Sequence, residues 1–563
     1  MIDFNSTYIR KKSVYLFFLF IIGYVLSSNY IYFPHLQDGK DTYFYMLTAK
    51  MILNKHYIPW IFHFTSYFGL YPFSVPPGAQ TLLAALYSLS EAGGDLTIII
   101  IGDVMFIFTS LLVFLISHKI TSNILLSMFF SFVAINMPSF FNWLWNAFSS
   151  RILFYLLFLF WLLFLIILNK KTKQDLKTFS ITICSTLLFG VFLYTIHRSA
   201  FLLVLMTTIF LINIAIKKLI EKTKYKQLFK YVIFVLLIFS LIFPFYNNLH
   251  IDGYNGEYYS HGFIKGDSST VQLLNFVLSI GAGSGIVLFF ISLMLILKLF
   301  FYQRKLSMFD VFSFSFLSTL LILSPAGLYV RCIIGIAFLI ISIDISSKFG
   351  MIFKLKIMDI KKVFVILIIV LILNNIYMQQ YWITNKIEKS TSVGRIMTEK
   401  AYMSALYVNN IISNNQSIVV DSWYLNRWIQ SHASVASLPP PLGMNSEINY
   451  AVYFRKNISA HPISFWEFIT DSKKSMGHHY IYYSEDYLKP PMDYIKLMNH
   501  PPDTNISIEI TNKYNTKYAL KDLHHKNKYL FWGDRWVDSK FYKNLSSDRY
   551  KIYSNDDIAI YLI

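Results

Sequence analysis

Two aspartates, Asp38 and Asp41, follow the first long apolar segment of the chain in the sequence Asp-Gly-Lys-Asp. A carboxylate at the edge of a hydrocarbon layer is costly unless it is paired or used. An aspartate at such a place could take a proton from the hydroxyl or amide of an acceptor. Asp41 also begins a helical pattern, where aspartate is a favoured capping residue. Capping and catalysis are compatible roles, so both interpretations stay open for Asp41.

Cationic side chains adjoin later apolar segments. His197 and Arg198 lie between two such segments, and Arg331 lies at the start of another, in Leu-Tyr-Val-Arg-Cys. The planar guanidinium presents a fork of donors that suits a phosphate group. An arginine at an interface also reaches towards water without binding any ligand. Phosphate binding and simple interfacial placement are therefore the two interpretations of these residues.

Three further polar residues could reach a cavity between apolar segments. Asp103 lies inside one such segment, so its carboxylate is expected to be paired or to face a polar cavity. Glu257 and His261 lie in the polar stretch 247–270. They could reach the same cavity, or they could be ordinary loop residues.

The elements that must position these residues are apolar helices. Of the 563 residues, 55% are hydrophobic and 14% are charged, and the mean hydropathy is +0.47. An ordinary soluble chain has about 25% charged residues. Such a composition predicts a polytopic α-helical membrane protein with about 11 transmembrane helices. The apolar segments that are long enough, or nearly so, lie at 13–33, 96–117, 121–137, 151–168, 178–196, 199–216, 229–247, 271–300, 309–324, 327–346 and 361–381.

The net charge of +19 is carried mainly by alternate loops between the apolar segments. Lys and Arg mark the cytoplasmic loops of membrane proteins. We therefore expect an integral protein of the plasma (cytoplasmic) membrane with a cytoplasmic N-terminus and an extracytoplasmic C-terminal region. No basic stripe lies on a soluble region, so no nucleic acid is expected as a partner.

The sequence predicts two domains. Residues 1–384 form a transmembrane domain, whose long first external loop, 34–95, carries two helical stretches at 41–56 and 76–92. Residues 385–563 have a soluble composition and are expected to form an extracytoplasmic α/β domain. Its expected elements are helices at 396–413 and 423–433 and strands at 417–422, 479–484, 549–554 and 558–563.

The first external loop resembles that of the GT-C superfamily of polytopic membrane glycosyltransferases. In that superfamily an acidic residue opens a helix of the form D-x-x-x-Y-x-x-x-A, matched here by Asp41, Tyr45 and Ala49. Aminoarabinose transferases and protein O-mannosyltransferases have their catalytic Asp at the position of Asp41. Oligosaccharyltransferase catalytic subunits have a similar D-x-x-F-x-Y segment, and their late arginine, which holds the lipid phosphate, resembles Arg331 in context.

Two departures from the oligosaccharyltransferase pattern bear on metal binding and on the acceptor. The next external loop, 138–151, contains no acidic residue, whereas those enzymes carry a metal-binding acidic motif there. The stretch Ser-Ile-Val-Val-Asp-Ser-Trp has a single Trp after Asp421, where those enzymes carry a motif with two. We therefore expect no cofactor, no metal ligands and no role for a divalent metal.

The resemblance implies an inverting hexosyl or pentosyl transferase of cell-envelope glycans. Its donor would be a polyprenyl-phosphate sugar, and its acceptor a glycan, a lipid or a protein at the extracytoplasmic face of the lipid bilayer. Asp41 would be the catalytic base, with Asp38 as the second candidate. The phosphate would be held by Arg331, Arg198 and His197, and the substrate cavity would involve Tyr45, Asp103, Glu257 and His261.

Two other classes of protein share some of these features. A transporter or lipid flippase would also have many spans and intramembrane polar groups. A non-catalytic scaffold of GT-C shape would share the whole architecture. The discriminating feature is geometric: in the enzyme, Asp41, Arg331 and Arg198 should converge on one outward-facing cavity, whereas a transporter should have its polar groups near the midplane.

Overall fold

The computed structural model describes the chain in separate stretches. They cover residues 4–30, 39–56, 78–90, 94–137, 148, 150–171, 399–413, 416–433, 435–438, 493–525, 528–531, 535–545 and 550–563, with short pieces within 181–196 and 336–343. These residues belong to two compact units. The first holds the described residues of 1–32, 101–145 and 150–378, and the second those of 33–100, 146–149 and 379–563.

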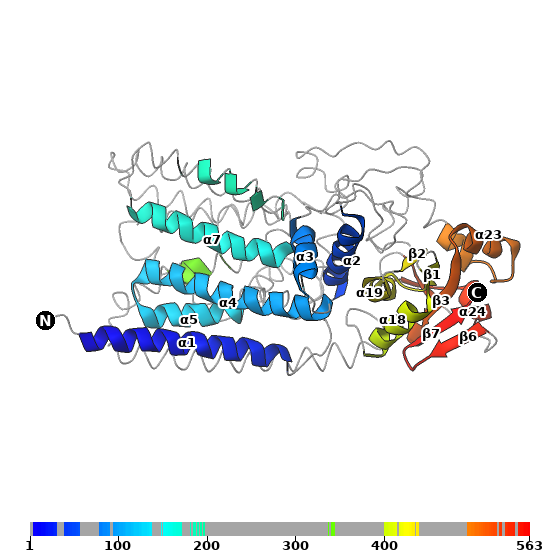
Figure 1. Cartoon of the computed structure of the whole chain (residues 1–563), viewed down its shortest axis with the longest axis horizontal. Helices are drawn as coiled ribbons and strands as arrows, with labels where there is room; N and C mark the ends of the chain where they lie inside the picture. Colours follow the sequence, from blue (N-terminus) through cyan, green and yellow to red (C-terminus); the bar gives the residue numbers. More distant parts are fainter. Residues whose placement is uncertain are drawn as a thin grey trace, which may run out of the picture. The chain divides into compact units, whose positions relative to one another are not determined.

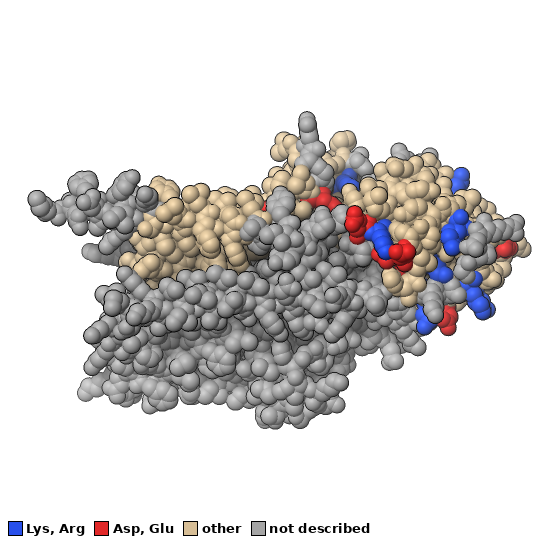
Figure 2. All heavy atoms as spheres, turned by 90° about the horizontal axis from the view of Figure 1, so that it is seen from below, with Lys and Arg blue, Asp and Glu red and all other residues tan. Residues whose placement is uncertain are grey.

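The first unit is built from apolar helices (Figure 1). They are α1 (Phe4–Tyr30), α4 (Gly94–Thr121), α5 (Ile124–Ile135) and α7 (Ser150–Lys171). The first turns of α4 belong to the second unit. These helices coincide with four of the segments predicted from the sequence. In Figure 2, a long part of the described surface is tan, and the blue and red side chains gather over another part of it.

Hydrogen bonds between small polar groups join the helices of this unit. The hydroxyls of Ser110 on α4 and Ser131 on α5 lie 2.7 Å apart, and both residues are buried. The hydroxyl of Tyr24 on α1 donates to Asn136, just after α5. Asn123 caps α5 by accepting from the N–H groups of residues 125 and 126. Such contacts satisfy polar groups that an apolar layer would otherwise leave without partners.

One helix of the described residues, Asp95–Thr121, is long and apolar enough to span a membrane. Shorter apolar stretches occur at Ser13–Leu26, Ile124–Ile135 and Ser150–Phe164. Five predicted segments, at 199–216, 229–247, 271–300, 309–324 and 361–381, lie outside the described residues, and those at 178–196 and 327–346 are described only in part. The number of about 11 spans therefore stays a prediction.

The second unit contains a five-stranded mixed sheet in the order β2-β1-β3-β7-β6. Its strands β1 (Ser417–Val420), β2 (Ala436–Leu438) and β3 (Thr516–Asp522) are parallel, and β6 (Lys551–Ser554) and β7 (Ile558–Leu562) continue it antiparallel. A hairpin is formed by β4 (Lys528–Phe531) and β5 (Arg535–Asp538). After residue 398 its helical elements include α18 (Glu399–Ile411), α19 (Trp423–Ala433), α23 (Asn505–Lys513), η5 (Leu523–His525) and α24 (Lys540–Leu545).

Several elements of this unit were predicted from the sequence. The helices at 396–413 and 423–433 and the strands at 417–422, 549–554 and 558–563 are present as α18, α19, β1, β6 and β7. The expected strand at 479–484 lies outside the described residues. The central strand β3, with β2 and the hairpin, was not predicted.

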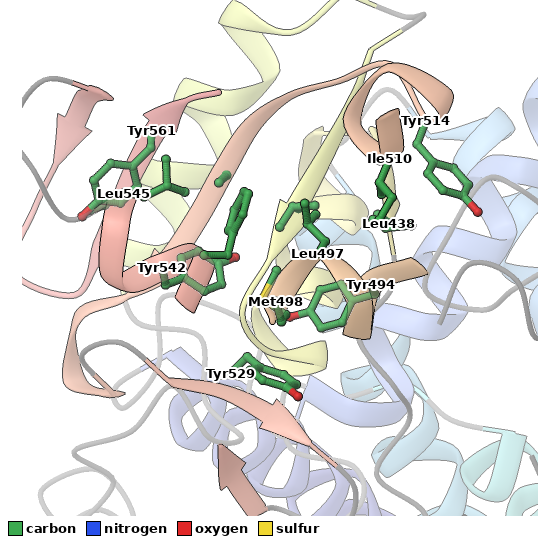
Figure 3. Packing of buried hydrophobic residues seen from close by; sticks show 14 residues of the cluster. Leu438, Tyr494, Leu497, Met498, Ile510, Tyr514, Tyr529, Tyr542, Leu545 and Tyr561 are labelled. Carbon is green, nitrogen blue, oxygen red and sulfur yellow. The ribbon is translucent and has the colours of Figure 1, made fainter. Parts of the chain in front are cut away.

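The core of the sheet is rich in tyrosine (Figure 3). Tyr494 and Tyr542 are fully buried, and their hydroxyls donate to the carbonyls of Val420 on β1 and Leu520 on β3, at 2.7 and 2.9 Å. Each ring therefore fills the core while its polar end pairs with the backbone of a central strand. Strands β1, β2, β3, β4 and β7 contribute buried residues to this core, and β1 is buried along its whole length.

Two carboxyl groups are buried at the carboxyl end of the parallel strands. Asp421 follows β1 and Asp522 ends β3, and both are inaccessible to solvent. One oxygen of Asp421 accepts from the N–H of Asp522, while the other, Oδ1, has no hydrogen-bond partner among the described residues. Burial, reinforced by the charge of Asp522, raises the pKa of Asp421 well above its ordinary value of 3.8.

We expect Asp421→Asn to reduce the loss of folding stability that the wild type shows as the pH rises. A carboxyl whose pKa is raised in the folded state stabilises the fold fully below the ordinary value, and this stabilisation is lost as the pH rises through the raised value. The thermal unfolding temperature of the wild type should therefore fall from mildly acid to alkaline pH, and that of Asp421→Asn should fall less. Asp556→Asn is the matched control, because Asp556 is exposed and its pKa is lowered by its hydrogen bond with Lys400. Equal slopes in the wild type and Asp421→Asn would contradict this assignment.

Candidate active site

Asp41 is the third residue of the helix α2 (Gly39–Lys55), which belongs to the second unit together with α3 (Gly78–Leu89). A carboxylate in the first turn of a helix is stabilised by the unpaired N–H groups and the dipole of that end. The sequence after it is mostly apolar and almost free of helix breakers, and its side chains are largely buried. The buried residues are Thr42, Tyr43, Tyr45, Met46, Leu47, Thr48 and Ala49. The helix that carries Asp41 is thus embedded in the unit.

The start of α2 is anchored at the residues that follow Asp41. The hydroxyl oxygen of Thr42 accepts from the N–H of Phe148 at 2.9 Å, and the ring of Tyr45 meets the ring of Phe148 edge-on at 5.7 Å between centroids. The ring of Tyr43 packs at 6.2 Å from Trp428, on α19. These contacts fix the backbone on which Asp41 is carried.

The end of α2 is anchored to the same helix, α19. The ammonium of Lys50 donates to the carbonyl oxygen of Ser431. This carbonyl lies in the last turn of α19, where carbonyl groups lack partners within the helix and attract cations. Burial lowers the pKa of Lys50, and the nearby charge of Asp95 opposes this shift.

His432 connects α19 to the first turn of α4. Its Nε2 lies 3.2 and 3.3 Å from the two carboxylate oxygens of Asp95, and its Nδ1 lies 2.9 Å from the carbonyl oxygen of Trp428. The side chain of His432 is only 8% exposed. Its ring also packs on Tyr43 at 5.8 Å and on Tyr402 of α18 at 5.3 Å. We call Tyr43, Lys50, Asp95, Trp428 and His432 the α2–α19 contact.

The structure describes three of the site residues that the sequence predicted. The backbone of Asp41 is in α2, Tyr45 is buried against Phe148, and Asp103 is buried in α4 with an interaction partner. The remaining candidates lie outside the described residues: Asp38, His197, Arg198, Glu257, His261 and Arg331. Their convergence on one cavity therefore stays a prediction.

Sequence reasoning missed the α2–α19 contact. Lys50 was only one of the loop charges, and Asp95 and His432 carried no interpretation. One signal was available: Trp428 and His432 are four residues apart in a predicted helix, so they lie on the same face. The partner of that face is distant in the chain, and no local pattern identifies it.

Among the described residues, no three His, Cys, Asp or Glu side chains come together as a metal site. We therefore assign no metal ligands among these residues.

No protein-family model matches this sequence, and no curated protein matches it. The likeness to solved structures shows the fold, which is similar to that of an archaeal oligosaccharyltransferase. One such structure is the oligosaccharyltransferase of Archaeoglobus fulgidus tethered to an acceptor peptide with the NVT sequon. The alignment covers 92% of this chain and 70% of the A. fulgidus chain, with 12% sequence identity and a TM-score of 0.52. The resemblance to oligosaccharyltransferases that the sequence indicated is thus confirmed at the level of the fold.

Two further structures of the A. fulgidus enzyme are similar. Its complex with Zn and sulfate has 13% identity and a TM-score of 0.48, over 91% of this chain and 68% of its own. Its complex with an inhibitory peptide and dolichol-phosphate has 12% identity and a TM-score of 0.49, over 97% of this chain and 76% of its own chain.

The Zn complex corrects the expectation that no cofactor is involved and that a divalent metal is absent. That expectation was wrong because it rested on the missing acidic residue in 138–151 alone. Metal ligands can come from segments that are distant in the sequence, so one loop does not decide the matter. Metal independence is therefore withdrawn.

Proposed function

We propose that this chain is a membrane glycosyltransferase that transfers a hexosyl or pentosyl group from a polyprenyl-phosphate donor to a glycan, lipid or protein acceptor. The observation that carries the proposal is the likeness of the fold to an oligosaccharyltransferase over 92% of the chain. The location of Asp41 supports it, because this carboxylate opens the helix that follows the first apolar helix.

In the proposed reaction, Asp41 accepts the proton of the acceptor nucleophile. The nucleophile forms a bond with the anomeric carbon of the sugar, and the bond from that carbon to the phosphate oxygen breaks. The electron pair leaves with the lipid phosphate, whose growing charge is stabilised by Arg331, Arg198 and His197. A single displacement inverts the anomeric configuration.

The remaining proposed residues shape the site. Asp103, Glu257 and His261 line the substrate cavity, and Tyr45 supports α2 through its contact with Phe148. No step is routed through a metal, since no ligands are assigned.

The proposed topology has a cytoplasmic N-terminus, a transmembrane domain at 1–384 and an extracytoplasmic domain at 385–563. The reaction then takes place at the extracytoplasmic face. The charge asymmetry of the loops supports this orientation.

The test is to incubate the purified full chain with a panel of polyprenyl-phosphate hexoses and pentoses, with divalent metal present. We expect release of polyprenyl phosphate and transfer of the sugar to an acceptor or to water, with inverted configuration by NMR. Failure to turn over any donor, combined with movement of lipid or solute across vesicles, would favour the transporter or flippase instead. A product with retained configuration would exclude the single displacement.

A further inference from the structure

We propose that the end of α3 and the start of α4 contact the acyl chains of the lipid bilayer through Leu89, Leu96 and Ile100. We call these three residues the lipid edge. They belong to the second unit, which also carries Asp41. The proposal concerns how this unit is held at the membrane, so it is independent of the proposed reaction.

The exposed side of α4 is a single apolar stripe. Every exposed residue between positions 96 and 116 is apolar, and successive ones are mostly four positions apart: Leu96, Ile100, Val104, Phe108 and Leu115. Residues four apart lie on one face of a helix. A helix face in contact with water carries polar side chains. Because the protein is an integral membrane protein, the surroundings that this stripe indicates are the acyl chains of the bilayer.

The length of the apolar part of α4 fixes where the hydrocarbon layer ends. Asp95 lies in the first turn of α4, and His118 and Lys119 lie in its last turn. The stretch between them, 96–117, contains one charged residue, Asp103, which is buried. At 1.5 Å per residue this stretch is about 32 Å long, and the hydrocarbon core of a bilayer is about 30 Å thick. The apolar stretch has almost no excess length, so one edge of the hydrocarbon lies at the first turn of α4.

The end of α3 lies at the level of that edge. The hydroxyl of Ser90, directly after α3, is 3.0 Å from the hydroxyl of Thr97 in the first turn of α4. Leu89, the last residue of α3, precedes Ser90 and is 82% exposed. Moving an exposed leucine from water to acyl chains is favourable, because it removes apolar surface from water. Leu89 therefore extends the lipid-facing surface of α4 onto α3.

The lipid edge holds the helices around Asp41 at the membrane. α3 packs against α2, the helix that carries Asp41. Lys50, near the end of α2, is close enough to Asp95 for the charge of that carboxylate to act on its ammonium. Because α2, α3 and the start of α4 pack together, a contact of α3 and α4 with lipid also fixes the distance of α2 from the hydrocarbon.

Spin-label accessibility tests the contact with lipid directly. The variants are Leu89→Cys, Leu96→Cys and Ile100→Cys, each in the full chain with its two native cysteines replaced by serine. The matched control is Ile508→Cys, because Ile508 is an exposed apolar residue of the same unit, next to Glu509 on α23. A nitroxide on each cysteine is measured in phosphatidylcholine vesicles against oxygen, which concentrates in lipid, and against a nickel chelate, which stays in water.

We expect the ratio of oxygen accessibility to nickel accessibility to rise from Leu96→Cys to Ile100→Cys, which is one turn deeper along α4. The ratio for Leu89→Cys should lie between these two, because the neighbouring Ser90 contacts Thr97. All three ratios should exceed that of Ile508→Cys severalfold.

Amide hydrogen exchange of the α3 peptide in the same vesicles tests whether the contact holds α3. Leu89→Ala removes apolar surface but keeps a strong helix former, since alanine has the highest helix propensity. We expect α3 to exchange severalfold faster in Leu89→Ala and at the wild-type rate in Ile508→Ala. If Leu89 were in water, Leu89→Ala would leave the exchange of α3 unchanged or slow it.

A Leu89→Cys label as accessible to the nickel chelate as that of Ile508→Cys would overturn the proposal, because Leu89 would then be in water. A label closed to both reagents would also overturn it, since protein, such as a second copy of this chain, would then cover Leu89. Unchanged exchange of α3 in Leu89→Ala would refute the anchoring role. None of these outcomes depends on sugar transfer, so a failure of the proposed function is recognised separately.

Discussion

Asp41→Asn is expected to reduce sugar transfer by a factor of about 10² or more. Asparagine has nearly the same size and is also favoured at helix starts, but it does not accept the proton of the acceptor. The loss should appear in kcat, measured with the donor that the wild type uses. The thermal unfolding temperature should stay close to that of the wild type, because the anchors of α2 at Thr42, Tyr43 and Lys50 are untouched.

Asp38→Asn is the matched control for this experiment. It removes a carboxylate three residues earlier, outside the D-x-x-x-Y-x-x-x-A frame, and should have a smaller effect. An inactive Asp38 variant beside an active Asp41 variant would show that the base was assigned to the wrong residue. Two fully active variants would refute carboxylate catalysis by this loop.

Trp428→Ala is expected to have the largest effect on stability. Trp428 is a residue of α19; its side chain is 1% exposed and packs against the ring of Tyr43 on α2. Replacing a buried tryptophan by alanine removes apolar contacts and leaves a cavity, at a cost of about 3–5 kcal/mol. For a unit of this size, the thermal unfolding temperature of the full chain should fall by on the order of 10 °C. Transfer should also fall, because Tyr43 loses its support.

Two variants calibrate this result. Trp428→Phe keeps an aromatic ring against Tyr43 and should recover much of the stability and activity. Met403→Ala changes a side chain on α18 that is 52% exposed, and it should change stability by about 0.5 kcal/mol or less. If Trp428→Ala unfolds at the wild-type temperature, the packing of α2 on α19 is not as the structure describes.

The site was predictable from the sequence only in its local part. Asp41 and Tyr45 stand in one short segment, whose spacing on a helix and place after the first apolar helix identify it. The residues that hold this segment, Phe148 and His432, are about 100 and almost 400 positions away along the chain. Contacts across such separations leave no periodic trace in a single sequence.

The buried polar groups of the sheet likewise combine a residue visible in the sequence with contacts that only the tertiary structure shows. The sequence shows Asp421 two residues before a tryptophan, but the burial of its carboxyl beside Asp522 depends on the pairing of β1 with β3. The sequence predicted β1, β6 and β7 from apolar and alternating runs. It missed β3, whose pattern of Lys, Tyr, Ala, Leu, Lys and Asp reads as strand only once its neighbours on both sides are known.

By itself, the sequence determined the membrane class, several helices of the first unit and the segment that carries Asp41. These features follow from local composition and periodicity, because a helix in an apolar layer satisfies its own backbone and needs only apolar side chains. The tertiary structure alone decided what surrounds that segment. Burial and hydrogen bonding are properties of pairs, so Lys50 on Ser431 and His432 on Asp95 exist only after α2, α4 and α19 have packed together.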